Sequence, residues 1–307
     1  MRGLARAGQN SGAGKLEMRM SHWIAEAFAA VLFASGLWVL RSKGRARMIE
    51  YLMIVVYGFM LEILDMHFFK SYHYSSHFIF MIGGVPVCIA LLWAVILAGA
   101  MEISDASGIP LTVRPFFDGI LALWLDLGLD AIAIRMGYWS WKIPLNEGWF
   151  GVPAGNLYAW MWVAFFYSIF ARAVRLCLEK DKNAVSIYLL VPHAAYIFLW
   201  CQLYIAGFAG SVFHLVTPNQ KLWLFAAQFA VFSFLSFYHL AQPRQVKKVD
   251  PFWLWSRYTL HGYFLICFFI FGFYRTAPWL GAIAVAVFAA EILGKRFVLY
   301  PSPSGRG

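Results

Sequence analysis

The sequence is dominated by consecutive apolar runs, each long enough to cross a lipid bilayer. A bilayer core requires roughly 20 apolar residues per helix, and a helix satisfies its own backbone hydrogen bonds there. The runs cover about residues 23–40, 48–69, 77–100, 115–137, 154–176, 184–208, 220–241, 257–274 and 278–294. The last two are the shortest, so we expect eight or nine helices. The sequence therefore predicts an all-α fold, a polytopic transmembrane helix bundle.

The composition excludes an ordinary soluble protein. Hydrophobic residues make up 62% of the chain and charged residues 13%, whereas soluble domains hold about 45–50% and about 25%. The net charge of +10 could suggest a nucleic-acid partner, but the cations are scattered between apolar runs. We therefore expect a multi-pass protein of the cell membrane with lipid around it and no nucleic acid. Residues 21–297 form one transmembrane domain, between a polar, disordered tail (1–20) and a C-terminal tail (298–307).

The distribution of cations predicts the orientation of the helices, because cytoplasmic loops carry an excess of Lys and Arg. If the loop after the first helix is cytoplasmic, the cytoplasmic segments hold 16 cations, including Arg257, and the external segments hold five. Four further cations in residues 1–20 oppose this assignment. Either the downstream bias overrides them, or translation starts at Met18 or Met20.

An internal repeat relates two stretches at an offset of 67 residues. The matching pairs are Tyr72-His-Tyr74 with Trp139-Ser-Trp141, Gly84-Val-Pro86 with Gly151-Val-Pro153, and Trp93 with Trp160. The repeat units cover about 48–100 and 115–176, and the second begins two helices after the first. Both units then have the same orientation, which predicts a parallel repeat in helices 2–5 about an axis along the membrane normal.

Carboxylates inside these apolar runs are the candidate functional residues, because an ionisable group in a membrane helix is costly and usually marks a site. Glu62 and Asp65 are three residues apart and Asp126 and Asp130 four apart, so each pair shares a helix face. Asp118 lies on the same helix as the second pair. The repeat places Glu62 and Asp130 roughly 10 Å below the outer surface, in one shared cavity. The alternative is that these groups pair with Arg135 or Lys70, or bond to Tyr and Trp side chains, and only fix helix packing.

Other titratable residues carry less weight. Glu26 and Glu291 are expected at the membrane interface, Glu291 in a solvated pair with Lys295 four residues later. His67, His73 and His77 near Asp65 could bind iron or zinc, but no second histidine cluster completes a metal site, so we expect interfacial histidines and no metal. The cysteines lack metal or disulfide spacing; they are Cys88, Cys177, Cys201 and Cys267. No nucleotide, flavin or acyl-enzyme motif is present, and no cofactor is expected.

At the repeat, the chain resembles the carotenoid biosynthesis membrane protein family, which includes the bacterial and archaeal carotenoid 1′-hydratases. The resemblance covers about residues 60–160. Its motifs are Leu61-Glu62, Ser71-Tyr72-His-Tyr74, Gly84-Val-Pro86 with Trp93, Leu125-Asp126-Leu-Gly-Leu-Asp130, Gly137-Tyr-Trp139-Ser-Trp141, and Phe150-Gly-Val-Pro153 with Asn156 and Trp160.

The resemblance implies a cofactor-independent hydratase that adds water to a terminal double bond of a carotenoid or other lipophilic isoprenoid. Glu62 would donate the proton and Asp126 or Asp130 would orient water, although residue types alone leave these roles interchangeable. The substrate would be bound by Tyr72, Tyr74, Trp139, Trp141, Asn156 and Trp160. Paired intramembrane carboxylates also occur in ion-coupled transporters, and a pigment-binding subunit without catalysis is a further alternative.

Overall fold

The computed structural model describes residues 12–68, 70–206 and 218–299. Within these residues, nine α-helices follow the nine apolar runs, so the all-α prediction is confirmed. They are α2 (Gly12–Arg41), α3 (Arg45–Phe68), α4 (Val87–Ala106), α5 (Arg114–Ala133), α6 (Ala154–Lys180), α7 (Val191–Ile205), α8 (Pro218–Ala241), α9 (Pro251–Ile270) and α10 (Pro278–Leu299). Two 3-10 helices, η1 (Lys182–Leu190) and η2 (Phe273–Arg275), and four short strands connect them: β1 (Tyr72–Tyr74), β2 (Met81–Ile82), β3 (Val85–Pro86) and β4 (Trp139–Trp141).

Two helix boundaries differ from the expected ones. The helix expected from residue 77 begins at Val87, because residues 81–86 form the β2–β3 hairpin and Pro86 occupies the N-cap. Proline is compatible with a helix start but not with a helix interior. The first helix, α2, begins at Gly12, inside the segment of residues 1–20 that was expected to be disordered. Residues 1–11 and 300–307 of the two expected tails lie outside the described residues.

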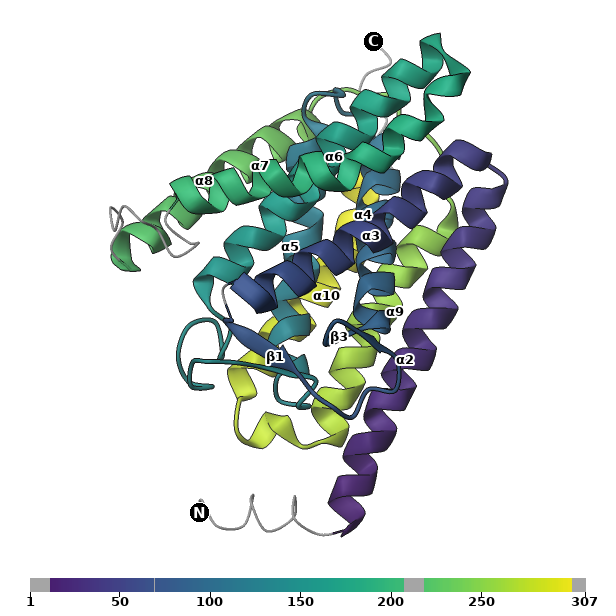
Figure 1. Cartoon of the computed structure of the whole chain (residues 1–307). Coiled ribbons are helices and arrows are strands. Elements are labelled where there is room, and N and C mark those ends of the chain that lie inside the picture. Colours follow the sequence, from purple (N-terminus) through teal and green to yellow (C-terminus); the bar gives the residue numbers. More distant parts are fainter. Residues whose placement is uncertain (1–11, 69, 207–217, 300–307) are drawn as a thin grey trace.

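Helices α4 and α5 form the centre of the bundle. In Figure 1, α4 is surrounded by α2, α3, α5 and α9, and α5 packs against α6, α8, α9 and α10. Six of the described helical segments are long and apolar enough to cross a membrane, and α4 is the most buried of them. The outer helices α2, α8 and α10 bury only a minority of their residues, as expected of helices that face lipid. The structure thus supports a multi-pass integral membrane protein.

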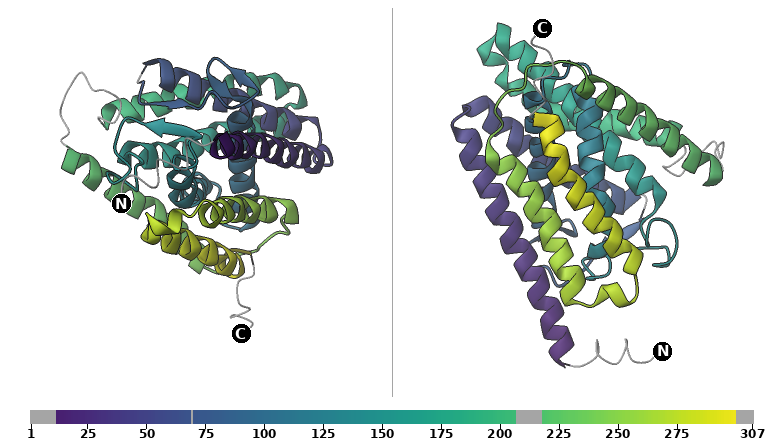
Figure 2. Two further views of the ribbon diagram at one scale, coloured as in Figure 1. Left: turned by 90° about the horizontal axis from the view of Figure 1, so that it is seen from below. Right: turned by 180° about the vertical axis from the view of Figure 1, so that it is seen from behind.

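The connections gather at two ends of the bundle. Residues 41–47, 107–113 and 242–250 lie at one end, which we call the basic end. Strands β1 and β4 and residues 142–153 lie at the opposite end, which we call the aromatic end. Both ends are visible in the right view of Figure 2. Successive connections therefore lie alternately at the two ends of the bundle. This alternation was assumed when loops were assigned to the cytoplasmic and external sides from the sequence.

The repeat is visible as contacts between equivalent residues. The rings of Trp93 and Trp160 lie 4.3 Å apart between centroids. At the aromatic end, β1 and β4 pair antiparallel with His73 opposite Ser140, at the centre of the register. At the basic end, Asp105 forms an ion pair with Arg172, 67 residues away. Equivalent residues meet at a twofold axis, so these pairs mark an axis that runs along the helices and confirm the parallel repeat.

Candidate functional site

A cavity of about 270 Å³ lies beside this axis, near the aromatic end. The β1–β4 sheet forms one wall, and α3, α4, α5 and α6 form most of the others. Eight of the nine residues that the sequence analysis assigned to the site line this cavity; they are Glu62, Tyr72, Tyr74, Asp130, Trp139, Trp141, Asn156 and Trp160. Asp126 is fully buried behind Asp130. The shared position expected for Glu62 and Asp130 is therefore observed.

Glu62 is surrounded by hydrogen-bond donors. Its Oε1 accepts a hydrogen bond of 2.7 Å from Trp93 Nε1. Its Oε2 accepts from the hydroxyl of Tyr74 at 2.7 Å and from that of Tyr72. Three donors on one carboxyl stabilise its charged form, so this arrangement favours Glu62 as a carboxylate.

The two tyrosines remain protonated donors. Burial raises the pKa of both Tyr72 and Tyr74 well above the usual value, and the charge of Glu62 raises it further. Their β1 strand holds them in place, because Tyr72 faces Trp141 and Tyr74 faces Trp139 across the sheet. The ring centroids of Tyr72 and Trp141 are 4.6 Å apart. The sheet therefore fixes the phenols that hold Glu62.

Asp126 and Asp130 have a different environment. They lie one turn apart on α5 and are 0% and 3% exposed. Both accept from the same amide, Asn156 Nδ2, at 3.2 Å and 2.5 Å. Oδ1 of Asp126 has no hydrogen-bond partner among the described residues. When two buried carboxyl groups lie one helical turn apart, charging both costs a large amount of free energy. The arrangement therefore favours one proton shared by the pair.

The rest of the cavity surface is mostly aromatic and aliphatic. The contacting pair Trp93 and Trp160 lies beside Glu62, and Trp139 and Trp141 form the sheet wall. Aromatic faces stabilise cations, and an apolar lining admits a lipophilic chain. Asp65 lies on the same cavity nearer the aromatic end, where its Oδ2 accepts from Ser71 Oγ at 3.2 Å.

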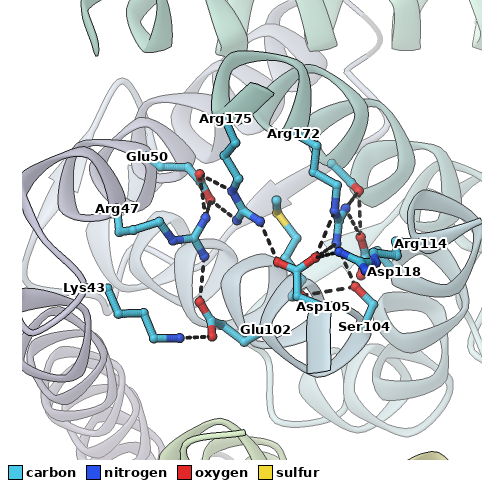
Figure 3. Close-up of polar contacts among 12 residues, drawn as sticks. Lys43, Arg47, Glu50, Glu102, Ser104, Asp105, Arg114, Asp118, Arg172 and Arg175 are labelled. Atoms are coloured by element: carbon cyan, nitrogen blue, oxygen red, sulfur yellow. Dashed lines mark hydrogen bonds and ion pairs between the residues drawn. The ribbon is translucent and has the colours of Figure 1, made fainter. Parts of the chain in front are cut away.

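Asp118 does not belong to this cavity. It lies in a second cluster of charges at the basic end, which Figure 3 shows and which we call the basic-end network. The network links carboxylates and cations of α3, α4, α5 and α6 and of the loop between α2 and α3. Its members are Lys43, Arg47, Glu50, Glu102, Asp105, Arg114, Asp118, Arg172 and Arg175.

Two arginines of α6 connect the network. Arg175 bonds to Glu50 and Asp105, each at 2.5 Å. Arg172 bonds to Asp118 at 2.6 Å and to Asp105 at 3.1 Å. Four of the nine residues are buried, Asp118 completely, and the ion pairs of both arginines with Asp105 join the two repeat units. For Asp118, helix packing is the reading that these contacts favour, with Arg172 as the partner in place of Arg135 or Lys70.

Two glutamates expected at the membrane interface have buried structural partners. Glu26 accepts hydrogen bonds from the backbone N–H groups of Ile79 and Phe80 at 3.0 Å and 2.9 Å, and so holds the segment that precedes β2. Glu291 bonds to Arg257 and, at 2.9 Å, to His261. The solvated pair expected for Glu291 is therefore wrong. Arg257, expected in a cytoplasmic segment, is 1% exposed inside α9.

The three histidines near Asp65 have separate partners. His67 bonds to the carbonyl of Ile63, His73 to Ser140 and His77 to Ser75. In the part of the chain that the structure describes, no three His, Cys, Asp or Glu side chains come together as a metal site.

Several cavity residues were not expected to belong to the site. Trp93 was identified only as the residue that matches Trp160 in the repeat. Because Trp160 was assigned to the site, this match was the signal that could have placed Trp93 there too. Tyr138, Tyr196 and Tyr263 also line the cavity. Tyr138 belongs to the Gly137-Tyr-Trp139-Ser-Trp141 motif but was not singled out there. Tyr196 of α7 and Tyr263 of α9 lie far from the motifs in sequence, so no local pattern identified them.

Comparison with known proteins gives one match. A family model described as carotenoid biosynthesis protein matches residues 21–218, which include the cavity residues of α2 to α7 and both units of the repeat. Nothing matches among curated proteins or among solved structures.

Proposed function

The chain belongs to the carotenoid biosynthesis protein family, and on that premise we propose that it is a membrane-embedded hydratase. Its reaction would be the acid-catalysed addition of water to a terminal double bond of a carotenoid or related polyprenyl chain. One observation carries this proposal: an apolar cavity is faced by a carboxyl that accepts three hydrogen bonds and by a second carboxyl that shares one amide with a buried neighbour.

The chemistry requires both kinds of carboxyl. A proton passes from Asp130 to the less substituted carbon of the alkene, and a tertiary cation forms on the other carbon. Charged Glu62 and the faces of Trp93 and Trp160 stabilise this cation. Water adds to the cation and gives its proton to Glu62. Return of that proton to the aspartate pair completes the cycle, so the net change is the addition of one water.

We propose roles opposite to those favoured from the sequence. Glu62 accepts three hydrogen bonds, which stabilise its carboxylate and make it a poor proton donor. Asp130 lines the cavity and shares the Asn156 amide with buried Asp126, which supports a proton held by this pair next to the substrate. We therefore assign the donor role to Asp130, the base role to Glu62 and a supporting role to Asp126.

The product distinguishes this function from its alternatives. Pigments from cells with and without the gene should differ by the mass of one water if the protein is a hydratase. A carrier would change uptake without a change in pigment mass, and a pigment-binding subunit would change neither. An unchanged pigment mass in the presence of a folded protein would contradict the proposal.

The site assignment is tested by Glu62→Gln and Asp130→Asn in purified protein. Each amide keeps the size of the side chain, but Gln cannot act as a base and Asn cannot donate a carboxylic proton. We expect each change to lower turnover by about 10²–10⁴, with normal insertion and yield. Glu179→Gln, at an exposed position of α6, is the matched control. Near-normal turnover in both site variants would remove these residues from the reaction.

A further inference from the structure

One carboxyl of the cavity wall takes no part in the proposed reaction. Asp65 lines the cavity on the same face of α3 as Glu62, three residues further along the helix. Because α3 runs from the basic end to the aromatic end, Asp65 lies about one turn nearer the aromatic end than Glu62. Asp65 is half-buried, whereas Glu62 is 7% exposed. An ionisable side chain in a membrane helix is costly and usually marks a functional site.

Ser71 is a second polar group beside Asp65. It also lines the cavity, and its Oγ donates a hydrogen bond of 3.2 Å to Oδ2 of Asp65. It directly follows Lys70, which is exposed. It directly precedes Tyr72, whose hydroxyl donates to Glu62. The Asp65–Ser71 pair therefore adjoins the exposed end of α3 on one side and a hydrogen-bond donor of Glu62 on the other.

The backbone holds both members of this pair in place. The N–H of Lys70 donates to the carbonyl of Asp65 at 3.2 Å and closes the end of α3. Lys70 has φ of +50°, a left-handed conformation that is typical where a chain leaves a helix. The carbonyl of Ser71 accepts from the N–H of Lys142 at 3.1 Å, next to the β1–β4 pairing. The helix end thus fixes Asp65, and the sheet fixes Ser71.

Hydration consumes one water in each turnover, and this water must enter a cavity whose surface is mostly aromatic and aliphatic. A buried water is stable where it has about two to four polar partners. A carboxylate offers about four acceptor sites, and a serine hydroxyl accepts as well as donates. The bond between Ser71 and Asp65 uses one acceptor site of the carboxyl. The pair therefore retains the capacity to bind a water one turn from Glu62.

We propose that Asp65 and Ser71 form the polar path by which water enters the cavity, and that Asp65 is a positioning residue for the water that adds to the substrate. This inference rests on the proposed function for the reaction itself. Water enters at the aromatic end, bonds to the pair and moves along α3 to Glu62. There its oxygen bonds to the tertiary cation, and its proton passes to Glu62. Asp65 neither gives nor receives a proton, so it supplies hydrogen-bonding capacity and not charge.

Two substitutions of Asp65 separate these properties. Asp65→Asn keeps the size and the polar atoms of the side chain but removes its charge, whereas Asp65→Leu keeps the approximate size and removes the polar atoms. The substrate is the pigment that gains the mass of one water in cells. We expect kcat of Asp65→Asn to stay within about threefold of the wild type and kcat of Asp65→Leu to fall by about tenfold or more. KM for the pigment should stay unchanged in both, which a loss of folding or of pigment binding would not produce.

Ser71→Val removes the other member of the pair and carries the kinetic test if Asp65→Leu fails to fold. We expect it to lower kcat by about tenfold as well, again without a change in KM. Ser75→Val is the matched control, because Ser75 is a half-buried serine of the same connection that lies outside the cavity lining. Its kcat should equal that of the wild type.

Thiol labelling tests the path without the need for turnover. In full-length protein whose four native cysteines are replaced by alanine, Asp65→Cys and Ser71→Cys are introduced one at a time, and each protein is reconstituted in lipid vesicles. A charged, membrane-impermeant methanethiosulfonate, present on both sides of the membrane, should modify both thiols. Leu64→Cys is the control, because Leu64 is also half-buried on α3 but lies outside the cavity lining. Its thiol should react more slowly by about tenfold or more.

Equal losses of kcat in Asp65→Asn and Asp65→Leu would assign a charge or a proton transfer to Asp65 and overturn the water path. Wild-type kcat in both Asp65→Leu and Ser71→Val would overturn it as well, as would thiols at positions 65 and 71 that react no faster than the control. The proposed reaction fails separately: modification of both thiols together with an unchanged pigment mass in cells would retain the water path and lose the hydratase.

Discussion

At the scale of single residues, the site depends on how each carboxyl is surrounded. Glu62 has two phenols and an indole as donors, whereas Asp126 and Asp130 share one amide. All three lie in the same low-dielectric bundle. In the proposed mechanism, this difference in donors favours a carboxylate on Glu62 and a retained proton on the aspartate pair.

Tyr72→Phe and Tyr74→Phe test the donors of Glu62. Each change removes a hydrogen bond to a charged group, which is worth about 1.5–3 kcal/mol, and leaves the ring in the wall. We expect turnover to fall by about 10–100-fold in each variant, with little change in melting temperature. Tyr274→Phe, at an exposed position outside the cavity, is the control. Turnover equal to that of the control would show that Glu62 does not need these donors.

Asp126→Asn tests the supporting role of the buried aspartate. Asp126 does not line the cavity, so its loss removes the partner that shares the proton without removing the donor. We expect turnover to fall by less than in Asp130→Asn, with both variants folded. Kinetics of the two variants, measured side by side, decide the order. A larger loss in Asp126→Asn than in Asp130→Asn would assign the donor role to Asp126.

At the scale of elements, the two repeat units are held together at both ends of the bundle. The β1–β4 pairing joins them at the aromatic end, and the basic-end network joins them at the other. Between these ends, Trp93 and Trp160 meet at the axis. The cavity is thus bordered by contacts that fix the position of one unit relative to the other.

Arg172→Gln tests the network. The change leaves Asp118 buried without its cation, and loss of one partner of a buried ion pair costs about 3–5 kcal/mol. We expect a clear loss of thermal stability in detergent, and a partial recovery when Asp118→Asn is added. Lys43→Gln is the comparison, because Lys43 is 38% exposed and exposed pairs contribute little. Equal melting temperatures for Arg172→Gln and Lys43→Gln would show that the buried part of the network does not contribute to stability.

Gly151→Ala tests the turn that precedes α6. Gly151 has φ of +92°, and an added Cβ would lie 2.9 Å from Cδ1 of Ile134. Alanine at a positive φ destabilises by more than about 1 kcal/mol, so we expect a lower melting temperature. In Gly294→Ala, an added Cβ on α10 has open space around it, and melting should stay the same or rise. A neutral Gly151→Ala would show that the turn relaxes.

At the scale of the whole molecule, the connections alternate between the basic and aromatic ends (Figure 2). The excess of cations in the segments of the basic end predicts that this end is cytoplasmic. Reporter fusions at residues 41–47, 177–183 and 244–250 should then give cytoplasmic signals, and fusions at 70–76 and 142–150 external ones. An external signal at 177–183 would contradict this orientation. The aromatic end, near which the cavity lies, would then face the cytoplasm.

The sequence by itself determined the helices, the repeat and the carboxylates at its centre, because these depend on patterns that are local along the chain. Apolar runs of spanning length predict helices wherever they occur, and an offset of 67 residues relates Tyr72 to Trp139 without any structure.

Only the tertiary structure decided which groups meet across the bundle. It placed Trp93 on Glu62, Arg172 on Asp118 and Arg257 on Glu291, and it brought α9 to the cavity. A helix fixes the spacing of its own residues but not the identity of the helix that it faces. The protonation state of a buried carboxyl depends on donors and charges from those facing helices, so the residue type alone does not determine it.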